Sequence, residues 1–325
     1  MRRLATALLA LGMAAPAAAV PLAEHPPLQT LVDDLVSTEG FDRAVLEQLL
    51  AGATFQQGII DAITRPAEKM PWHRYRPIFM TEQRIAGGVE FWHAHADLLA
   101  RAEREHGVPA SVITAIIGVE TRYGAVTGRW RTIDALTTLA VAGLPRSAFF
   151  GRELRELLLL GREEQLDLSG LSGSYAGALG LPQFIPSSYR AYAVDFDGDG
   201  RRDLLASPAD AIGSVANYLR RHGWQRGEPI SAAATVEPAG VDLAQGDLKP
   251  TLTLAELRQQ GVSSPTDSAP TLKAKLIRLE AEQGDEFHLG FQNFYAITRY
   301  NHSALYAMAV TQLAAAIGAR HAATP

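Results

Sequence analysis

The segment from Val108 to Arg122 constrains the fold most, because it is too apolar to lie anywhere but inside a protein. Its apolar residues are Val112, Ile113, Ala115, Ile116, Ile117 and Val119. On a helix they cover nearly every side, and such a helix packs within a core. Pro109 suits the first turn and Gly124 follows the end. We therefore expect a buried helix with other helices packed around it.

Helical spacing also dominates most of the remaining chain. Apolar residues recur at helical intervals from Pro27 to about Arg104, and again at 134–142, 149–165, 209–222 and 303–317. From about Pro229 to Gly284 the composition shifts to Pro, Gly and Thr. Short apolar stretches lie there at 234–236 and 252–254, with one helix-like piece at 254–260. This pattern predicts a mainly α (α+β) protein with a small inserted α/β unit.

The N-terminus predicts export. Arg2 and Arg3 precede an apolar run from Leu4 to Ala15, and small residues follow up to Ala19. This is the pattern of a secretory signal peptide cleaved after Ala19, since a membrane-spanning helix needs about 20 apolar residues. The chain has no cysteine for a disulfide or a lipid anchor, and its net charge of -5 gives no reason to expect nucleic acid as a partner. We expect a soluble periplasmic protein.

Glu120 is the first candidate catalytic residue, because it is a lone carboxylate in the last turn of the apolar helix. The helix dipole and apolar neighbours should both raise its pKa, as a general acid near neutral pH requires. A structural ion pair with Arg122 is an equally simple interpretation at this point. Gly118 and Gly124 flank the carboxylate and suggest that something approaches the backbone closely.

The second unusual stretch, 173–189, is crowded with small residues. Ser174 and Gln183 could donate hydrogen bonds to sugar hydroxyl and acetamido groups, and Tyr175, Phe184 and Tyr189 could offer apolar faces to sugar rings. A tight helix–helix crossing would explain the small residues as well.

Four motifs in order, GVETRYG, GSYAGALGLPQFIPSSY, DAIGSVANYL and ITRYNHSALYAMAV, together resemble the lytic murein transglycosylase B family. The resemblance covers nearly all of the chain from about Leu31. It implies a lysozyme-like helical catalytic domain that cleaves the β-1,4 bond between N-acetylmuramic acid and N-acetylglucosamine, leaving 1,6-anhydromuramic ends. A hydrolytic muramidase and a non-catalytic peptidoglycan-binding protein are the alternatives.

The resemblance also implies roles for individual residues. Glu120 matches the single catalytic acid and base. The residues that match the family's glycan groove are Ser174, Gln183, Tyr218, Tyr300, Asn301, Tyr306, Tyr75 and Arg146. Many relatives have a second basic residue where this chain has Ser147, which leaves a peptide-stem contact there open.

One carboxylate suffices if the substrate supplies the nucleophile. Glu120 would protonate the leaving oxygen and then take the proton of the muramyl C6 hydroxyl as that oxygen closes on C1. Asp134 is better explained as a first-turn residue of its own helix. No cofactor is expected for catalysis.

A loop at 195–210 predicts a structural calcium ion. Asp195, Asp197, Asp199 and Asp203 alternate around a sixth-position Gly200, with Arg201 offering a backbone carbonyl, as in the first half of an EF-hand loop. The twelfth position holds Ala206 instead of glutamate, and the resemblance implies that Asp210 closes a longer loop. A solvated acidic turn is the alternative.

We expect the chain to divide into a signal peptide (1–19), an N-terminal helical region (20–104), a lysozyme-like core (105–228), the insertion (229–286) and a C-terminal part that completes the core (287–325). We expect a monomer whose partner is peptidoglycan, and the sequence leaves contacts with cell-wall synthesis proteins open.

Overall fold

The structure is a computed structural model that describes residues 18–65 and 70–323. The predicted signal peptide lies outside these residues except for Ala18 and Ala19. These two form strand β1 (Ala18–Ala19), which pairs antiparallel with β2 (Thr54–Phe55).

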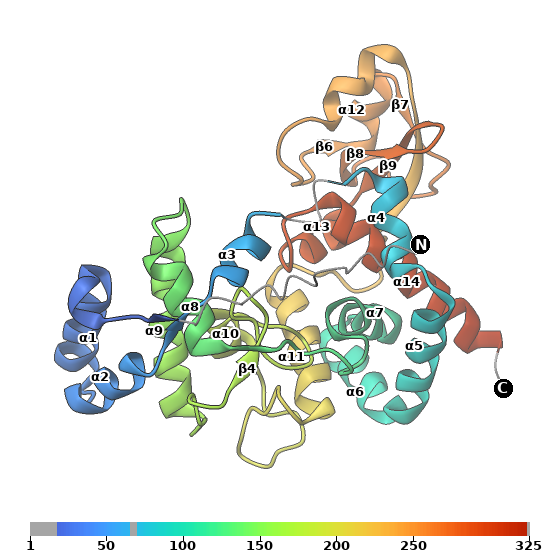
Figure 1. Cartoon of the computed structure of the whole chain (residues 1–325). Coiled ribbons are helices and arrows are strands. Elements are labelled where there is room, and N and C mark those ends of the chain that lie inside the picture. Colours follow the sequence, from blue (N-terminus) through green and yellow to red (C-terminus); the bar gives the residue numbers. More distant parts are fainter. Residues whose placement is uncertain (1–17, 66–69, 324–325) are drawn as a thin grey trace, which may run out of the picture.

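Helices make up most of the described chain and agree with the predicted mainly α class (Figure 1). Their bounds are α1 (Pro26–Glu39), α2 (Arg43–Ala51), α3 (Gln57–Ile63), α4 (Trp72–Phe79), α5 (Glu82–Ala94), α6 (Ala96–His106), α7 (Ala110–Thr121), α8 (Thr132–Val141), α9 (Ser147–Glu163), α10 (Pro186–Tyr192), α11 (Pro208–Arg221), α12 (Leu254–Gln259), α13 (Gln292–Thr298) and α14 (Ala304–Ala323). The helices predicted at 134–142, 149–165, 209–222 and 303–317 are confirmed as α8, α9, α11 and α14.

Helix α7 is the predicted buried helix, and it lies at the centre of the core. It packs against α5, α6, α11 and α14. Every residue from Val112 to Gly118 is buried. Pro109 precedes the helix as its N-cap instead of lying in its first turn. The all-round apolar pattern therefore has a direct cause, because neighbours cover each side of α7.

The insertion is built on one antiparallel sheet with the strand order β6-β8-β9-β5-β7. Its strands are β5 (Ser231–Val236), β6 (Leu252–Thr253), β7 (Val262–Ser263), β8 (Lys273–Ala281) and β9 (Gly284–Gly290). The sheet and α12 enclose a small separate core that includes Leu257, Leu276 and Phe291. The sequence interpretation found β5, β6 and α12 but missed the β8–β9 hairpin. The division into domains remains a prediction.

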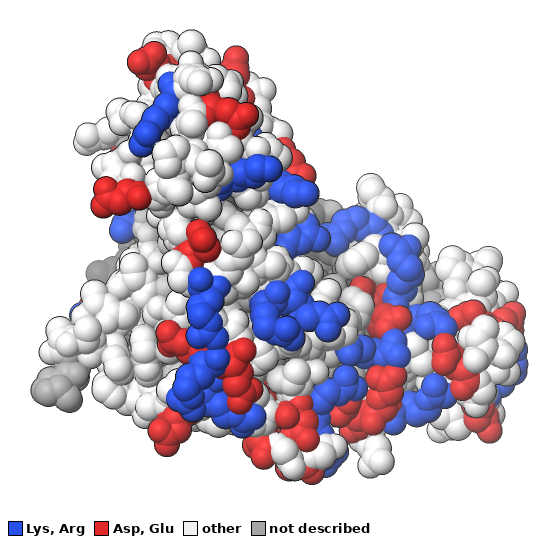
Figure 2. Space-filling model, turned by 180° about the vertical axis from the view of Figure 1, so that it is seen from behind, with Lys and Arg blue, Asp and Glu red and all other residues white. Residues whose placement is uncertain are grey.

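The sheet unit projects from the helical body beside α4 and α13 (Figure 1). On the face shown in Figure 2, Lys and Arg side chains gather in the middle of the molecule at the foot of this projection, whereas Asp and Glu are more frequent toward the lower rim. Among the described residues, no helix combines the length and the apolar character needed to cross a bilayer.

Candidate active site

Glu120 lies half-buried in the last turn of α7, and its carboxyl group has a defined partner. The Tyr306 hydroxyl, on α14, donates a hydrogen bond of 2.5 Å to Glu120 Oε1. Burial, followed by the negative charge of Glu120, raises the pKa of Tyr306 well above its usual value. Tyr306 therefore stays protonated and can donate to the carboxylate throughout the neutral range.

Two further predicted residues, Tyr218 and Tyr300, lie next to this pair. Their rings are 4.8 Å apart, and the Tyr300 ring is 6.4 Å from that of Tyr306. The Tyr300 hydroxyl donates to Pro182 O at 2.8 Å, and the Tyr218 hydroxyl donates to Arg299 O at 2.5 Å. Burial is the main cause that raises the pKa of both phenols, and the Glu120 charge adds to it. Three motifs distant in sequence thus meet around one carboxylate.

Tyr75 belongs to the same neighbourhood, since it interacts electrostatically with Tyr306. It is only 2% exposed on α4, beside Trp72 and Phe79. Asn301 follows Tyr300 in the turn between α13 and α14 and is half-buried.

Arg146 does not lie among the residues around Glu120. It is exposed at the start of α9, and its guanidinium lies over the rings of Phe149 and Phe150 on the same helix. Its partners in the described chain therefore do not include the residues around Glu120.

The small-residue loop lies against the end of α7, where the Thr121 hydroxyl binds Leu181 O at 3.0 Å. Gln183 has a left-handed backbone with φ of 51°, and its Nε2 donates to Thr127 O and Gly180 O at 3.0 and 2.9 Å. Ser174 Oγ accepts hydrogen bonds from the amides of Ala176 and Ala178. Both predicted donors are half-buried and held in place by the loop backbone.

Two of the small residues, Gly173 and Gly180, are explained by close approach of the protein's own backbone. A Cβ on Gly173 would lie 2.4 Å from Ala178 O, and one on Gly180 would lie 2.1 Å from Leu204 O. The suggestion that Phe184 and Tyr189 offer faces to sugar rings is wrong, because these side chains are 2% and 0% exposed. Their apolar surface is used in the core, whereas Tyr175 remains 38% exposed.

The two glycines beside Glu120 also have an internal explanation. A Cβ on Gly118 would lie 2.5 Å from the Tyr123 hydroxyl, so the close approach is made by the protein itself. Gly124 has φ of 91°, which glycine adopts without strain. Their presence was therefore weaker support for a substrate than the sequence suggested.

Asp134 is confirmed as a first-turn residue of α8. Its carboxylate accepts from the Thr54 amide at 2.8 Å and pairs with Arg131 at 2.6 Å. These bonds connect α8 to the N-terminal region. Asp134 is therefore not a second carboxylate beside Glu120.

The acidic loop brings together Asp195, Asp197 and Asp210, whose carboxylate oxygens lie within 4.8 Å of one another. Burial is the main cause that raises the pKa of Asp210, although its bonds to the amides of Phe196 and Asp203 oppose this. Asp199 and Asp203 do not join the group. Their carboxylates instead accept hydrogen bonds from the amides of the following turns.

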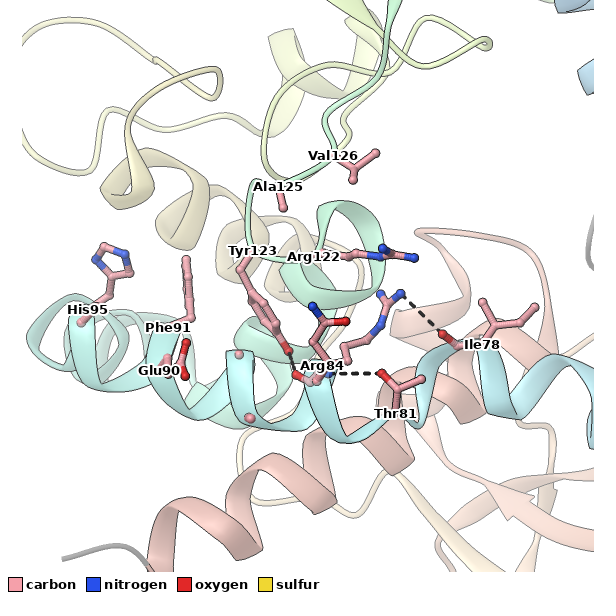
Figure 3. Close-up of a pocket in the computed structure, with 14 residues that line it drawn as sticks. Ile78, Thr81, Arg84, Glu90, Phe91, His95, Arg122, Tyr123, Ala125 and Val126 are labelled. Atoms are coloured by element: carbon pink, nitrogen blue, oxygen red, sulfur yellow. Dashed lines mark hydrogen bonds between the residues drawn. The ribbon is translucent and has the colours of Figure 1, made fainter.

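A pocket of about 800 Å³ lies between α5 and the turn that follows α7 (Figure 3). Arg84, Gly87, Glu90 and Phe91 line it from α5, and Arg122, Tyr123 and Val126 line it from the turn. Glu120 is not among its lining residues, so this pocket is not the place where the catalytic candidates meet. The sequence did not single out Arg84 or Tyr123 as candidates, although Tyr123 stands in the GVETRYG motif and Gly87-Gly88 is an unusual pair inside a helix.

Comparison with known proteins gives relatives that are all transglycosylases. The sequence profile described as "Transglycosylase SLT domain" matches residues 23–315. Membrane-bound lytic murein transglycosylase B of Escherichia coli (strain K12) is 41% identical over 305 residues, which cover 91% of this chain and 83% of that protein.

Solved structures agree with this match. Soluble lytic transglycosylase SltB1 from Pseudomonas aeruginosa is 48% identical with a TM-score of 0.85, covering 91% of this chain and 100% of that one. Lytic transglycosylase Slt35 from Escherichia coli, solved in complex with calcium, is 40% identical with a TM-score of 0.86 over 94% and 97%. SltB3 from Pseudomonas aeruginosa, solved with NAG-anhNAM-pentapeptide, is 32% identical with a TM-score of 0.77 over 89% and 78%. The fold is therefore the lysozyme-like one predicted from the motifs.

Proposed function

The chain belongs to the family of proteins with a transglycosylase SLT domain, and we propose that Glu120 is the acid and base of its reaction. The protein is a lytic transglycosylase that acts on peptidoglycan, as its relatives are. The bond cleaved is the β-1,4 bond between N-acetylmuramic acid and N-acetylglucosamine. The observation that carries the assignment of Glu120 is its contact with Tyr306, at the point where the family's separated motifs meet.

In the proposed reaction Glu120 first protonates the glycosidic oxygen, and the bond from that oxygen to muramyl C1 breaks. The muramyl C6 hydroxyl then attacks C1, and the Glu120 carboxylate takes its proton. The product has a 1,6-anhydro ring, and Glu120 is again protonated for the next cycle. Intramolecular attack removes the need for a bound water, and substrate-assisted schemes of this kind use one carboxylate.

The other candidate residues fall into two groups in this proposal. Buried Tyr75, Tyr218 and Tyr306 would shape the surroundings of the carboxylate, and Tyr306 would bind it directly. Half-buried Ser174, Gln183, Tyr300 and Asn301 are the groove residues that would bind glycan. Arg146 stands apart and would contribute only if the substrate extends as far as α9.

The decisive experiment uses Glu120→Gln, with Glu90→Gln on α5 as the matched control. Purified sacculi are digested, and the released muropeptides are identified by mass spectrometry. We expect anhydro ends from wild type and from the control, and no release by Glu120→Gln, which should still bind sacculi. Reducing ends from wild type would indicate a muramidase instead, and binding without release by wild type would indicate a non-catalytic protein. Turnover by Glu120→Gln would remove Glu120 from the mechanism.

We also propose that Asp195, Asp197 and Asp210 hold a structural calcium ion. Their grouped oxygen atoms are ligands that calcium prefers, and three carboxylates this close repel one another without a cation. The calcium complex of Slt35 makes this cation the natural choice. When bound, the ion would join the loop to the start of α11.

For partners and location, we propose that the enzyme binds peptidoglycan strands as a monomer in the periplasm. The complex of SltB3 with a pentapeptide-bearing disaccharide supports the glycan as the ligand. The predicted signal peptide supports the periplasm. No lipid-modified cysteine is expected here, although the Escherichia coli relative is named membrane-bound.

A further inference from the structure

Arg84 on α5 is a buried cation in an unusual position. It is 8% exposed, and in the described part of the chain it forms no ion pair with a carboxylate. Burial, and then the nearby Arg122, lowers its pKa. A buried charge is costly unless hydrogen bonds compensate for it. The hydrogen bonds of the Arg84 guanidinium therefore indicate why this cation is buried here.

The acceptors of its guanidinium group are backbone carbonyls, and two of them lie at the C-terminal end of α7. Nη1 donates to Gly118 O at 2.5 Å and to Val119 O at 3.3 Å. The Gly118 carbonyl also accepts the closing hydrogen bond of α7 from the Arg122 amide at 3.1 Å, so Arg84 is a second donor to it. Arg84 thus binds the two peptide groups that directly precede Glu120, and its charge lies at the negative end of the α7 dipole.

Tyr123 secures the chain on the other side of Glu120. Its hydroxyl donates to Arg84 O at 2.7 Å, so the same residue of α5 is used a second time (Figure 3). Its ring lies against Gly87 and Gly118, where any Cβ would come within 3.1 Å of it. These glycines leave the space in which the tyrosine sits.

The turn held in this way is strained. Arg122, Tyr123 and Gly124 have φ angles of 52°, 61° and 91°, and the first two carry side chains that disfavour this region. Such a conformation persists only where the surroundings impose it.

We propose that Arg84 is a positioning residue for Glu120. Through the carbonyls before Glu120 and the Tyr123 turn after it, α5 holds the end of α7 so that the carboxyl group stays against Tyr306. This inference rests on the proposed role of Glu120. It assigns to Arg84 an effect on the chemical step and no contact with substrate.

The test compares Arg84→Gln, Arg84→Lys and Tyr123→Phe. Arg162→Gln is the matched control, because Arg162 also binds a carbonyl at a helix end, Glu39 O of α1. For each variant, kcat and KM are measured on soluble uncrosslinked glycan strands across pH, together with the melting temperature. We expect kcat of Arg84→Gln to fall roughly 10- to 100-fold with KM nearly unchanged, as for a misplaced catalytic group.

The pH profile separates positioning from mere stability. Removing the cation that binds the two peptide groups before Glu120 should disfavour ionisation of that acid, so the alkaline limb of kcat should move to higher pH in Arg84→Gln. Arg84→Lys keeps the charge and should restore that limb with only partial recovery of kcat. Arg162→Gln should lose stability and leave both kcat and the profile unchanged.

An Arg84→Gln protein with wild-type kcat and pH profile would overturn the inference. If Arg84→Gln does not fold, Tyr123→Phe provides the test. It removes the hydrogen bond to Arg84 O but keeps the packing of the ring, so kcat should fall. An unchanged kcat in Tyr123→Phe would refute the inference. Glu120→Gln is assayed in parallel. Turnover by Glu120→Gln defeats the proposed function, whereas an inactive Glu120→Gln beside a normal Arg84→Gln defeats only this inference.

Discussion

The Tyr306 hydroxyl is the contact that most directly affects the chemistry of Glu120. A hydrogen bond to a carboxylate is shorter and stronger than one between neutral groups, and 2.5 Å is consistent with this. The donor fixes one oxygen of the carboxyl group, so the rotation of the acid relative to the sugar is restricted.

Tyr306→Phe should therefore impair catalysis more than folding. Loss of a hydrogen bond to a charged group corresponds to about 1.5–3 kcal/mol, or roughly 10- to 100-fold in kcat. Tyr189→Phe, which loses a bond to the neutral Arg202 carbonyl and is not one of the groove residues, is the matched control and should retain most activity. Steady-state kinetics on glycan strands measures both. Equal losses in the two variants would argue against a special role for Tyr306.

Glu153 is a buried acid remote from the proposed chemistry, and it should make stability depend on pH. Burial raises its pKa above 4.5, whereas bonds from the amide and hydroxyl of Ser187 and the charge of Arg152 oppose the rise. Since the folded pKa exceeds the unfolded one, the contribution of Glu153 to stability is fully present below about pH 4.5 and is lost as pH rises through the folded pKa.

Glu153→Gln should flatten this decline, because the variant has no proton to lose. Melting temperatures from pH 4 to 7 test this, and the comparison concerns their slope, since the variant also loses an acceptor for Ser187. Parallel curves for wild type and variant would show that Glu153 does not titrate in this range.

At the scale of elements, α7 and α5 pack together at glycines, Gly118 on α7 and Gly87 on α5, where the Tyr123 ring fills the space. The helical pattern of α7 was evident from sequence, but the reason for Gly118 was not. Local sequence contains no information on which ring will pack there, because Tyr123 reaches Gly118 only after the strained turn has formed.

Gly118→Ala tests this fit. In an exposed helix this change stabilises by up to about 1 kcal/mol. Here the added methyl group meets the Tyr123 hydroxyl, so we expect net destabilisation and lower activity. Gly151→Ala in α9, where nothing lies within 4 Å, is the control and should be neutral or stabilising. Denaturant unfolding gives both values, and a stabilised Gly118→Ala would contradict the packing.

The β8–β9 hairpin shows where local patterns fail. Five of the nine residues of Lys273–Ala281 are Lys, Ala or Glu, which are not typical strand residues. Its strand conformation comes from pairing with β9, from Lys275 opposite Gly290 to Ala281 opposite Gly284. Since a β-strand depends on its partner, composition alone did not reveal it.

At the scale of the whole molecule, the acidic loop joins parts of the helical body. Arg101 on α6 donates to Phe196 O in the loop at 2.6 Å, and Asp210 ties the loop to the first turn of α11. A cation in the loop would therefore act on global stability and not on the chemistry.

Added calcium should raise the melting temperature of the wild type and should do so much less in Asp197→Ala. Asp61→Ala, an exposed acid on α3, is the control and should respond as the wild type does. Differential scanning calorimetry with calcium or with a chelator measures the shift. No shift in the wild type would favour the solvated acidic turn.

By itself, the sequence determined that a buried helix lies within 108–122 with a carboxylate in its last turn, because the spacing of apolar residues depends only on local residue order. It also determined the family, through four separated motifs. Only the tertiary structure decided the partners of Glu120. Tyr306 lies 186 positions away, and Arg84 lies 34 positions from the carbonyl of Gly118 that it binds. Such contacts arise when helices pack, and packing depends on surfaces contributed by the whole chain.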